Sequence, residues 1–258
     1  AEELQHFALE NDVESARQTQ DEDQNIEAVG AGFVNKDVLR INDMKKTFKS
    51  KGKEVKAVNG LSLKMYEGQI TALLGHNGAG KTTLINILTG MSPPTSGAAS
   101  IYGFDVRDSS DMTAIRSMTG VCPQHNVLFD DLTCAEHLEF YGAIKGVPSE
   151  SLNKQVIRSL EDVGLTDQKD HFSRQLSGGQ KRKLSVAIAL IGDPKIIFLD
   201  EPTAGMDPAS RRHLWSLLKS RQKGKVILLT THFMDEADIL ADRKAIISKG
   251  KLKCCGSS

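Results

Sequence analysis

Residues 75–82 read Gly-His-Asn-Gly-Ala-Gly-Lys-Thr, directly after the apolar run 69–74 and overlapping the beginning of a helix-forming segment, 81–89. The order matches G-x-x-x-x-G-K-[ST] between a buried strand and a helix, where glycines let backbone N–H groups surround phosphate oxygens. The beginning of the helix offers the positive end of its dipole to the same anion. Lys81 would reach the β- and γ-phosphates, and the Thr82 hydroxyl would bind Mg²⁺. The stretch predicts an α/β protein that binds a nucleoside triphosphate.

Two acids follow a later apolar run. Residues 196–201 read Ile-Ile-Phe-Leu-Asp-Glu. Asp200 would lie at the carboxyl edge of the sheet, where ligands bind in such folds, and its carboxylate would hold Mg²⁺ directly or through water. Glu201 would face the attacking water as a general base. Apolar strands that end in Asp-Glu are common, so the pairing with the phosphate-binding loop is what predicts a hydrolytic site.

Strands and helices are expected to alternate along the chain. Three short β-prone pieces predict a small antiparallel sheet near the beginning: 38–41, 54–58 and 61–65. Apolar runs predict further strands at 69–74, 196–199, 226–230 and 244–248. Because strands then alternate with helices, the sequence predicts a mostly parallel sheet that is covered on both faces.

The middle of the chain, about 130–192, reads as helical. Thr133 and Glu136 form a T-x-x-E capping box, and apolar residues at positions 152, 156, 160 and 163 precede Gly164, a suitable helix end. A further helix is expected to begin at Asp207 and to run toward residue 221, since Pro follows Asp there. This region is expected to form an inserted helical subdomain.

Length and charge suggest how the chain is organised. Its 258 residues suit one large α/β domain, alone or with an inserted subdomain. Nine acids and one base fall within residues 1–29, which leaves 24 acids and 32 bases, a net charge of +8, for the rest. We expect an acidic leader over 1–32 with a short helix near 4–16, a domain over 33–255 and a tail over 256–258. A mildly basic body suits a polyphosphate ligand without proving one.

Neither a membrane span nor a signal peptide is visible in the sequence. No apolar run approaches the about 18–20 residues that a bilayer span needs. The four cysteines, at positions 122, 134, 254 and 255, lack the spacing of a metal site, so reduced cytosolic thiols are expected. Acylation of the adjacent pair Cys254 and Cys255 is the alternative. We therefore expect no direct membrane insertion by this segment.

The stretch Leu-Ser-Gly-Gly-Gln at 176–180 identifies a family. It resembles the LSGGQ signature of ABC transporter ATPases letter for letter, and the family's other marks follow in order. Residues 120–124 resemble the Q-loop, 204–207 the D-loop and 230–232 the segment that ends in the switch histidine. The resemblance covers about 38–255. It implies a P-loop NTPase (RecA-like) core with a mostly parallel sheet, an N-terminal antiparallel β subdomain and an inserted α-helical subdomain.

The resemblance implies a full set of site residues for ATP and Mg²⁺. Catalytic roles fall to Glu201, His232, Gln124 and Lys81. Nucleotide contacts fall to Phe48, Gly75, Asn77, Gly78, Gly80, Lys81, Thr82, Thr83, Ser177, Gly178, Gly179, Gln180 and Asp207. Metal ligands are Thr82, Gln124 and Asp200.

Two phosphate-binding helix ends on one chain suggest a pair of modules. Ser177 and the amides after it would begin a second helix toward residue 191, about 100 residues beyond the first cradle. In the family, the signature of one nucleotide-binding domain faces the P-loop of another, and ATP ties the pair together. The resemblance therefore implies a second nucleotide-binding domain as partner. It also implies transmembrane domains that contact the Q-loop region and the helical subdomain, at the cytosolic face of a membrane.

Longer stretches resemble one subfamily more than the others. These are residues 75–80, 123–129, 182–185 and 232–238, with the end of the chain at 250–258. They look like the first nucleotide-binding domain of subfamily A, the large eukaryotic transporters associated with lipids, which makes lipid the implied cargo. Phe233 departs from the pattern, since a second histidine often follows the switch histidine.

Other functions remain as alternatives at this point. One is a soluble ABC protein that acts on ribosomes. DNA-repair types separate the two motifs by a very long coiled coil, whereas 101 residues separate them here (176 − 75), and no nucleic acid partner is expected. Another is a module that binds nucleotide without turnover, which Glu201 and His232 argue against. The basic residues Lys181, Arg182 and Lys183 are expected to form a solvated helix face.

Overall fold

The strands form two sheets in the computed structural model, which describes residues 26–27, 33, 37–50 and 53–257. A four-stranded antiparallel sheet has the order β2-β1-β4-β5, and a six-stranded sheet has the order β10-β9-β3-β8-β7-β6. The strands are β1 Asp37–Ser50, β2 Lys53–Tyr66, β3 Gln69–Leu74, β4 Ser96–Ile101, β5 Phe104–Asp105, β6 Thr119–Cys122, β7 Ile196–Asp200, β8 Val226–Thr231, β9 Arg243–Ser248 and β10 Lys251–Ser257.

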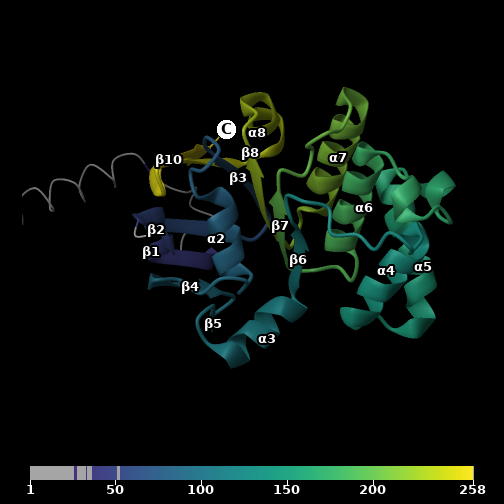
Figure 1. The fold of residues 1–258 in the computed structure, drawn as a ribbon, viewed down its shortest axis with the longest axis horizontal. Coiled ribbons are helices and arrows are strands. Elements are labelled where there is room, and N and C mark those ends of the chain that lie inside the picture. The colour runs from purple at the N-terminus through teal and green to yellow at the C-terminus, as the bar shows by residue number, and fades with distance from the viewer. Residues whose placement is uncertain (1–25, 28–32, 34–36, 51–52, 258) are drawn as a thin grey trace, which may run out of the picture.

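Helices surround the six-stranded sheet (Figure 1). They are α2 Lys81–Leu88, α3 Ser109–Ser117, α4 Cys134–Ile144, α5 Ser149–Val163, α6 Gly178–Leu190, α7 Pro208–Arg221 and α8 Met234–Leu240, with 3-10 turns at Thr166–Gln168 and Ser173–Gln175. The capping boxes of α4 (Thr133 with Glu136) and α6 (Ser177 with Gln180) are both formed. Within the described ranges, every helix is too short or too polar to span a bilayer.

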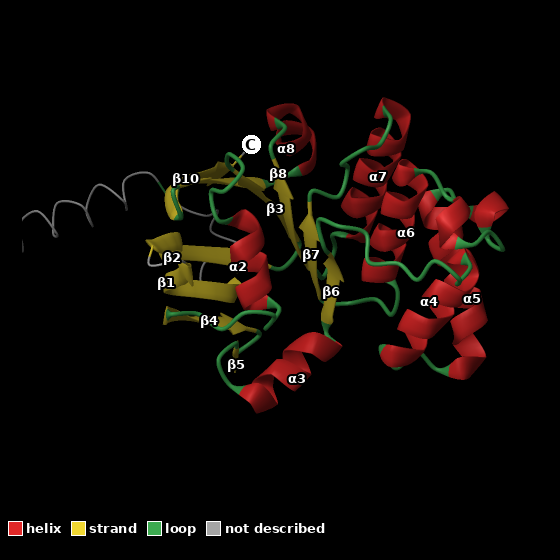
Figure 2. Ribbon diagram, viewed as in Figure 1, coloured by secondary structure: helices red, strands yellow, loops and turns green. Residues whose placement is uncertain are grey.

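The six-stranded sheet separates two apolar cores. Side chains alternate between the faces of a strand, so Leu73, Phe198 and Leu228 face α2 and the antiparallel sheet. Their neighbours Leu74 and Leu199 face the other core, with α4 to α8. Figure 2 shows the same arrangement, with α2 between the two sheets and α6 and α7 beyond the six-stranded one. The predicted α/β fold is confirmed.

Two details differ from the sequence prediction. The pieces expected at 54–58 and 61–65 belong to one strand, β2. The pairing passes from Lys45↔Asn59 to Met44↔Leu61, and the extra residue, Gly60, has φ 78°, a value that glycine adopts without strain. The strand therefore bulges at the point where the pattern suggests a break.

The end of the chain adds a strand that the sequence did not predict. Gly256 and Ser257, expected in a tail, extend β10, which runs antiparallel to β9. The backbone N–H of Glu27 donates to the Cys255 carbonyl at 2.8 Å, and the Glu27 carboxylate accepts from Ser257. Of the expected leader, residues 26–27 thus lie against β10, while the helix expected near 4–16 lies outside the described residues.

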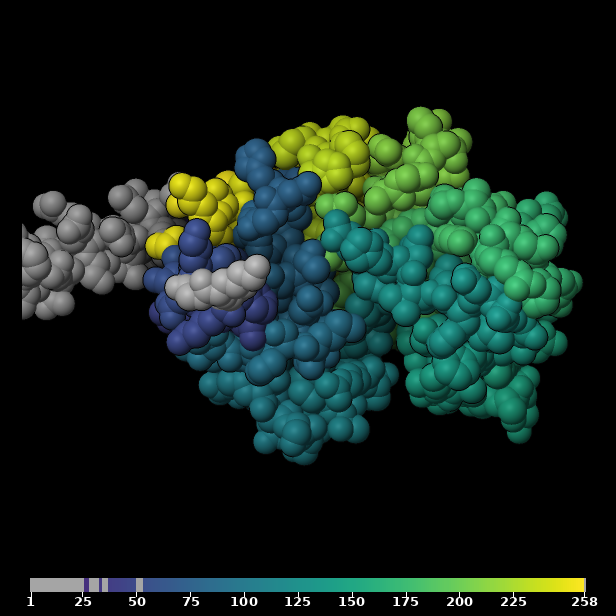
Figure 3. Space-filling view, viewed as in Figure 1, coloured from purple at the N-terminus to yellow at the C-terminus, as the bar shows by residue number. Residues whose placement is uncertain are grey.

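Helices α4, α5 and α6 lie in a lobe beside the lobe that holds the two sheets, which Figure 3 shows in teal to green. All four cysteines are free thiols, and Cys122, Cys134 and Cys255 are buried. Burial raises the pKa of Cys122 and of Cys134 to about 11, which keeps both thiols neutral. The lobe of helices is attached to the sheet through α6, which packs in the same core as β7 and β8.

Candidate functional site

Four loops meet at the carboxyl edge of the six-stranded sheet. β3, β8, β7 and β6 are parallel neighbours, and they pair near their ends as Leu74↔Thr231, Asp200↔Thr230 and Cys122↔Leu199. The phosphate-binding loop, His232, Glu201 and Gln124 follow within two residues of these strand ends. Ligands bind at such edges of parallel sheets because the loops converge there. The fold thus gathers predicted site residues from positions more than 150 apart in sequence.

The phosphate-binding loop wraps around one ammonium group. Lys81, 6% exposed, donates from Nζ to the carbonyls of Gly75 at 2.6 Å and His76 at 3.2 Å. Gly80 has φ 107°, and a Cβ there would lie 2.2 Å from the carbonyl oxygen of Ala57 on β2. Only glycine fits this close approach. Lys81 is the first residue of α2, so its charge lies beside the positive end of the helix.

Part of the loop is open to solvent. Asn77, Gly78 and Thr82 are exposed, and Thr83 is half-buried on the first turn of α2. A Cβ at Gly78 would meet no atom within 4 Å. The exposed face of the loop therefore has room for phosphate groups against the backbone.

Asp200 and Glu201 are both fixed by Thr230 on the neighbouring strand. The Thr230 hydroxyl donates to Asp200 Oδ1 at 2.5 Å and accepts the backbone N–H of Glu201 at 3.0 Å. Glu201 adopts φ 52°, in the left-handed region that few non-glycine residues occupy. Its Oε1 lies 3.6 Å from Nδ1 of His232. This backbone geometry directs the Glu201 carboxylate toward the histidine.

The turn that carries His232 is held by hydrogen bonds to a buried glutamate on α8. Buried Glu236 accepts from the Thr231 hydroxyl at 2.6 Å and from Trp215 Nε1 at 3.0 Å. The Phe233 ring lies beside that of His232, with ring centroids 4.1 Å apart, and the Arg211 guanidinium lies over the Phe233 ring, 4.9 Å from its centroid. Phe233 thus acts as packing for the exposed imidazole at the position where a second histidine is frequent.

Phe48 presents an exposed ring beside the phosphate-binding loop. The residue lies on β1, is 44% exposed and pairs with Val55 on β2. Two residues further along β2 is Ala57, whose carbonyl lies against Gly80 of the loop. Lys46 Nζ lies 5.1 Å from the ring centroid. An exposed aromatic face at this place can stack on a purine base.

Ser177 lies on the other side of the sheet from α2. It is the exposed N-cap of α6, where its Oγ accepts from the backbone N–H of Gln180 at 3.2 Å. Gly178 leads this helix with open space around it, and Gly179 lies near the D-loop carbonyl of Gly205. The side chains of α6 pack into one core and those of α2 into the opposite core. The chain therefore does not bring its signature helix and its phosphate-binding loop to one face.

The remaining predicted residues lie on exposed loops. Gln124 follows β6 and is exposed. Asp207 is the N-cap of α7, where its carboxylate accepts from the backbone N–H groups of Ala209 and Ser210, each at 3.0 Å. The hydrogen bonds from Ser210, above all, lower the pKa of Asp207 to about 2. Its role as helix cap is confirmed.

The prediction of a solvated face at 181–183 is wrong for Arg182, which is 1% exposed. Its guanidinium donates to backbone carbonyls after β6 and after β7. A signal was available: Arg182 has helical spacing to Val186 and Ala189, both buried, so this side of α6 faces the core. Thr230, the partner of both acids, was missed because only strand pairing brings it beside them.

The available oxygen ligands fit Mg²⁺ bound with a nucleotide. The described residues contain no cluster of three or more His, Cys, Asp or Glu that could hold a metal. Thr82 and Gln124 offer an exposed hydroxyl and an exposed amide, and Asp200 offers a carboxylate. Mg²⁺ commonly binds through one or two protein ligands and takes the others from phosphate and water. The residues present suit that mode of binding.

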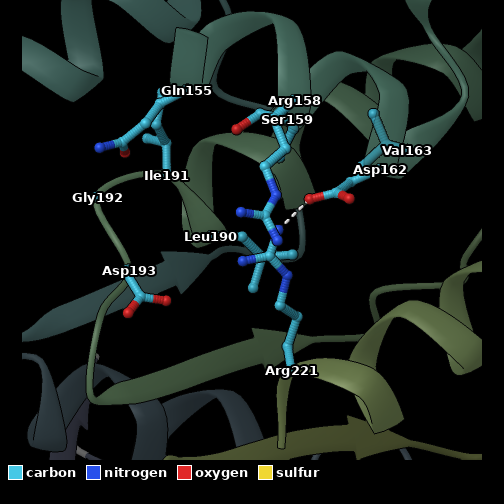
Figure 4. Close-up of a pocket in the computed structure, with 11 residues that line it drawn as sticks. Gln155, Arg158, Ser159, Asp162, Val163, Leu190, Ile191, Gly192, Asp193 and Arg221 are labelled. Atoms are coloured by element: carbon cyan, nitrogen blue, oxygen red, sulfur yellow. Dashed lines mark hydrogen bonds and ion pairs between the residues drawn. The ribbon is translucent and has the colours of Figure 1, made fainter. Parts of the chain in front are cut away.

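A cavity of about 400 Å³ lies elsewhere, between α5, the end of α6 and α7 (Figure 4). Arg158 and Arg221 point into it, and Arg221 is paired with Asp162. None of the predicted site residues lines this cavity.

Comparison with known proteins connects this geometry to one family. The sequence pattern of the ABC transporter family matches residues 58–204. The chain is 54% identical to the human "Cholesterol transporter ABCA5" over 90% of its own length, and 53% identical to the rat "Phospholipid-transporting ATPase ABCA3" over 85%. It spans 14% and 13% of these proteins.

Its fold is similar to that of a dimeric ATP-binding cassette solved with ADP and phosphate in a post-hydrolysis state. The TM-score is 0.79 at 27% identity, over 85% of this chain and 98% of the other.

Proposed function

This chain belongs to the ABC transporter family as an ATPase domain, and we propose that it works as one half of a pair that closes on ATP. The observation that carries the proposal is the placement of its two phosphate-binding helix ends on opposite sides of one sheet. A phosphate held by Lys81 would need the Ser177 of a second module, and this chain's Ser177 would complete the other site. Similarity to a dimeric cassette supports this arrangement.

Binding of the triphosphate would rest on the loop before α2. Lys81 now donates to two carbonyls of its own loop and would transfer its N–H donors to the β- and γ-phosphates. The exposed ring of Phe48 would stack on the adenine. Thr82, Gln124 and Asp200 would hold Mg²⁺, which neutralises phosphate charge when bound. Thr230 keeps the Asp200 carboxylate oriented toward this edge.

Hydrolysis would use Glu201 as the general base. Its carboxylate is 14% exposed at the sheet edge and lies 3.6 Å from His232 Nδ1. A carboxylate in this place can take a proton from an attacking water, while the exposed imidazole contacts the γ-phosphate. Closure against the second module would exclude bulk water from both groups.

The larger protein that would contain this chain is proposed to move lipid. Two relatives carry names that specify cholesterol and phospholipid, and both are far longer than this chain. Four apolar side chains near the Q-loop are exposed: Val127, Phe129, Phe140 and Ile144. We propose that transmembrane domains dock on this surface at the cytosolic face of a membrane.

The decisive experiment replaces the base. Glu201→Gln keeps the shape of the side chain and removes its basicity, so ATP binding should remain while hydrolysis falls about 10²–10⁴-fold. Binding is measured with a fluorescent ATP analogue, and turnover is measured as phosphate release at several chain concentrations. Glu161→Gln on exposed α5 is the matched control and should retain full turnover. Turnover by Glu201→Gln at the wild-type rate would remove the assigned role.

A further measurement tests the pairing. Specific activity of the wild-type chain should rise with its concentration, because each site needs two modules. Activity strictly proportional to chain concentration would contradict the paired site while leaving the general base intact.

A further inference from the structure

Arg182 lies at the junction of three segments of the proposed site. It is on α6, five residues after the N-cap Ser177, and its side chain reaches the loops that follow β6 and β7. The residue is 1% exposed, so its charge is removed from water. Its hydrogen bonds divide into two groups, one for each loop.

The first group holds the backbone around Glu201. Nη2 donates to the carbonyls of Asp200 and of Glu201, the latter at 3.0 Å, and Nε donates to the carbonyl of Pro202 at 3.3 Å. Three consecutive carbonyls therefore turn toward one guanidinium. Regular strand geometry would alternate them, and the left-handed φ of 52° at Glu201 is what brings them together.

The second group holds the loop that carries Gln124. Nη1 donates to the carbonyl of Pro123 at 2.6 Å, to that of Gln124 at 3.3 Å and to Asn126 Oδ1 at 3.2 Å. Asn126 Oδ1 also accepts from the hydroxyl of Ser185, one turn further along α6, at 3.1 Å. The loop is thus tied to α6 through its backbone as well as through one side chain.

None of these six acceptors is a carboxylate, although the guanidinium is buried. Burial of a charge without a counter-ion is costly, and here backbone carbonyl dipoles replace the counter-ion. A planar fork of five N–H donors can bond both loops at once, whereas a lysine ammonium has three donors at one point. The arrangement therefore depends on the shape of arginine as well as on its charge.

We propose that Arg182 is a positioning residue that sets Glu201 relative to Gln124 and links both to the signature helix. The inference rests on the proposed function and concerns the regulation of the same site. Glu201 is held on its N–H side by Thr230 and on its carbonyl side by Arg182. A displacement of α6 by a partner module, or of the Gln124 loop by a membrane domain, would reach the proposed base through one side chain.

The test compares Arg182 with a second cation bonded to the same helix. Lys145 Nζ donates to the carbonyls of Ile188, Ala189 and Ile191 at the far end of α6. Arg182→Lys and Arg182→Met change the cation near the site, and Lys145→Met removes the one away from it. Thermal unfolding identifies which variants are folded, and two readouts follow: amide hydrogen exchange, and ATP affinity measured separately from kcat.

The expected results separate positioning from general structural support. In folded Arg182→Met, kcat should fall about 10- to 100-fold, the scale of a misplaced reacting group, with ATP affinity within about threefold of wild type. Arg182→Lys should recover only part of this loss. In both Arg182 variants, amide hydrogen exchange should increase relative to wild type in the peptides that cover 123–129 and 200–206. Lys145→Met should leave kcat and both peptides as in wild type.

A milder pair keeps the test decisive if Arg182→Met and Arg182→Lys do not fold. Asn126→Ala removes one acceptor of Nη1 from an exposed loop, and should raise exchange at 123–129 and lower kcat about threefold. Ser185→Ala removes only the other hydrogen bond to Asn126 and leaves Arg182 in place, so its effects on exchange at 123–129 and on kcat should be smaller than those of Asn126→Ala. Wild-type exchange in Arg182→Lys, or in Asn126→Ala where the arginine variants do not fold, overturns the inference. Exchange does not require hydrolysis, so this outcome is distinct from an inactive wild-type chain, which would refute the proposed function instead.

Discussion

Ser177→Ala tests the proposed pairing because Ser177 serves two purposes that can be measured separately. Its Oγ accepts the backbone N–H of Gln180 at 3.2 Å, while the Gln180 side chain accepts the N–H of Ser177 at 2.8 Å. This cap uses a lone pair of the hydroxyl and leaves its hydrogen free. In the proposed pair, that hydrogen is donated to a phosphate bound on the partner module.

The structural part of the effect can be calibrated within the same chain. Thr133 caps α4 with the same geometry: its Oγ1 accepts from the backbone N–H of Glu136 at 3.2 Å, and the Glu136 carboxylate accepts from the backbone N–H of Thr133 at 2.7 Å. Replacement of an N-cap by alanine costs about 0.5–2 kcal/mol, or roughly 2–4 °C in Tm per kcal/mol for a chain of this size. Ser177→Ala and Thr133→Ala should therefore lower Tm by similar amounts.

The functional part should appear in Ser177→Ala alone. A hydrogen bond to a charged group contributes about 1.5–3 kcal/mol, which corresponds to about a 10- to 150-fold loss in kcat/KM. The assay is phosphate release at chain concentrations where turnover still rises with concentration. If Ser177→Ala lowers Tm by as much as Thr133→Ala but keeps kcat/KM within about twofold of wild type, Ser177 is only a helix cap and the pairing is refuted.

Three further results are expected. Phe48→Ala should weaken binding of a fluorescent ATP analogue about 5- to 150-fold, because base stacking on an aromatic ring contributes about 1–3 kcal/mol. Phe48→Trp should retain the affinity of wild type, and equal affinities of Phe48→Ala and wild type would exclude stacking. Gly80→Ala should lower Tm strongly, since its methyl would lie 2.2 Å from the Ala57 carbonyl at φ 107°, whereas Gly178→Ala, with open space around it, should stay within about 4 °C of wild type. Burial lowers the pKa of Lys145 from 10.5 to about 8, so the unfolded chain binds more protons in that window and this group makes stability rise with pH. The urea midpoint of wild type minus that of Lys145→Met should accordingly increase between about pH 7.5 and about pH 9.5. A difference that stays constant over this range would show that the pKa of Lys145 is not lowered.

Much of the candidate site is predictable because its signals are local. The phosphate-binding loop, the Asp200–Glu201 pair and the capping boxes each depend on residues within a few positions of one another. Backbone geometry in a glycine-rich turn or at a helix end follows from the sequence there. The strands at 69–74 and 226–230 and the helix from Pro208 to Arg221 were predictable for the same reason.

Other parts depend on contacts between distant segments. The extra strand β10 forms because its backbone pairs with β9, and Gly60 continues β2 because β1 accommodates the bulge. Thr230 becomes the partner of Asp200 through strand pairing 30 positions away. None of these contacts leaves a periodic pattern in the residues concerned.

The sequence alone determined which chemistry this chain carries, because phosphate loops, acids at strand ends and helix caps are built from neighbouring residues. Only the tertiary structure decided that Ser177 and Lys81 lie on opposite sides of one sheet, and that Arg182 is buried between two loops. The physical reason is that the order of strands and the packing of helix faces are set by burial of apolar surface over the whole chain, which no single segment specifies.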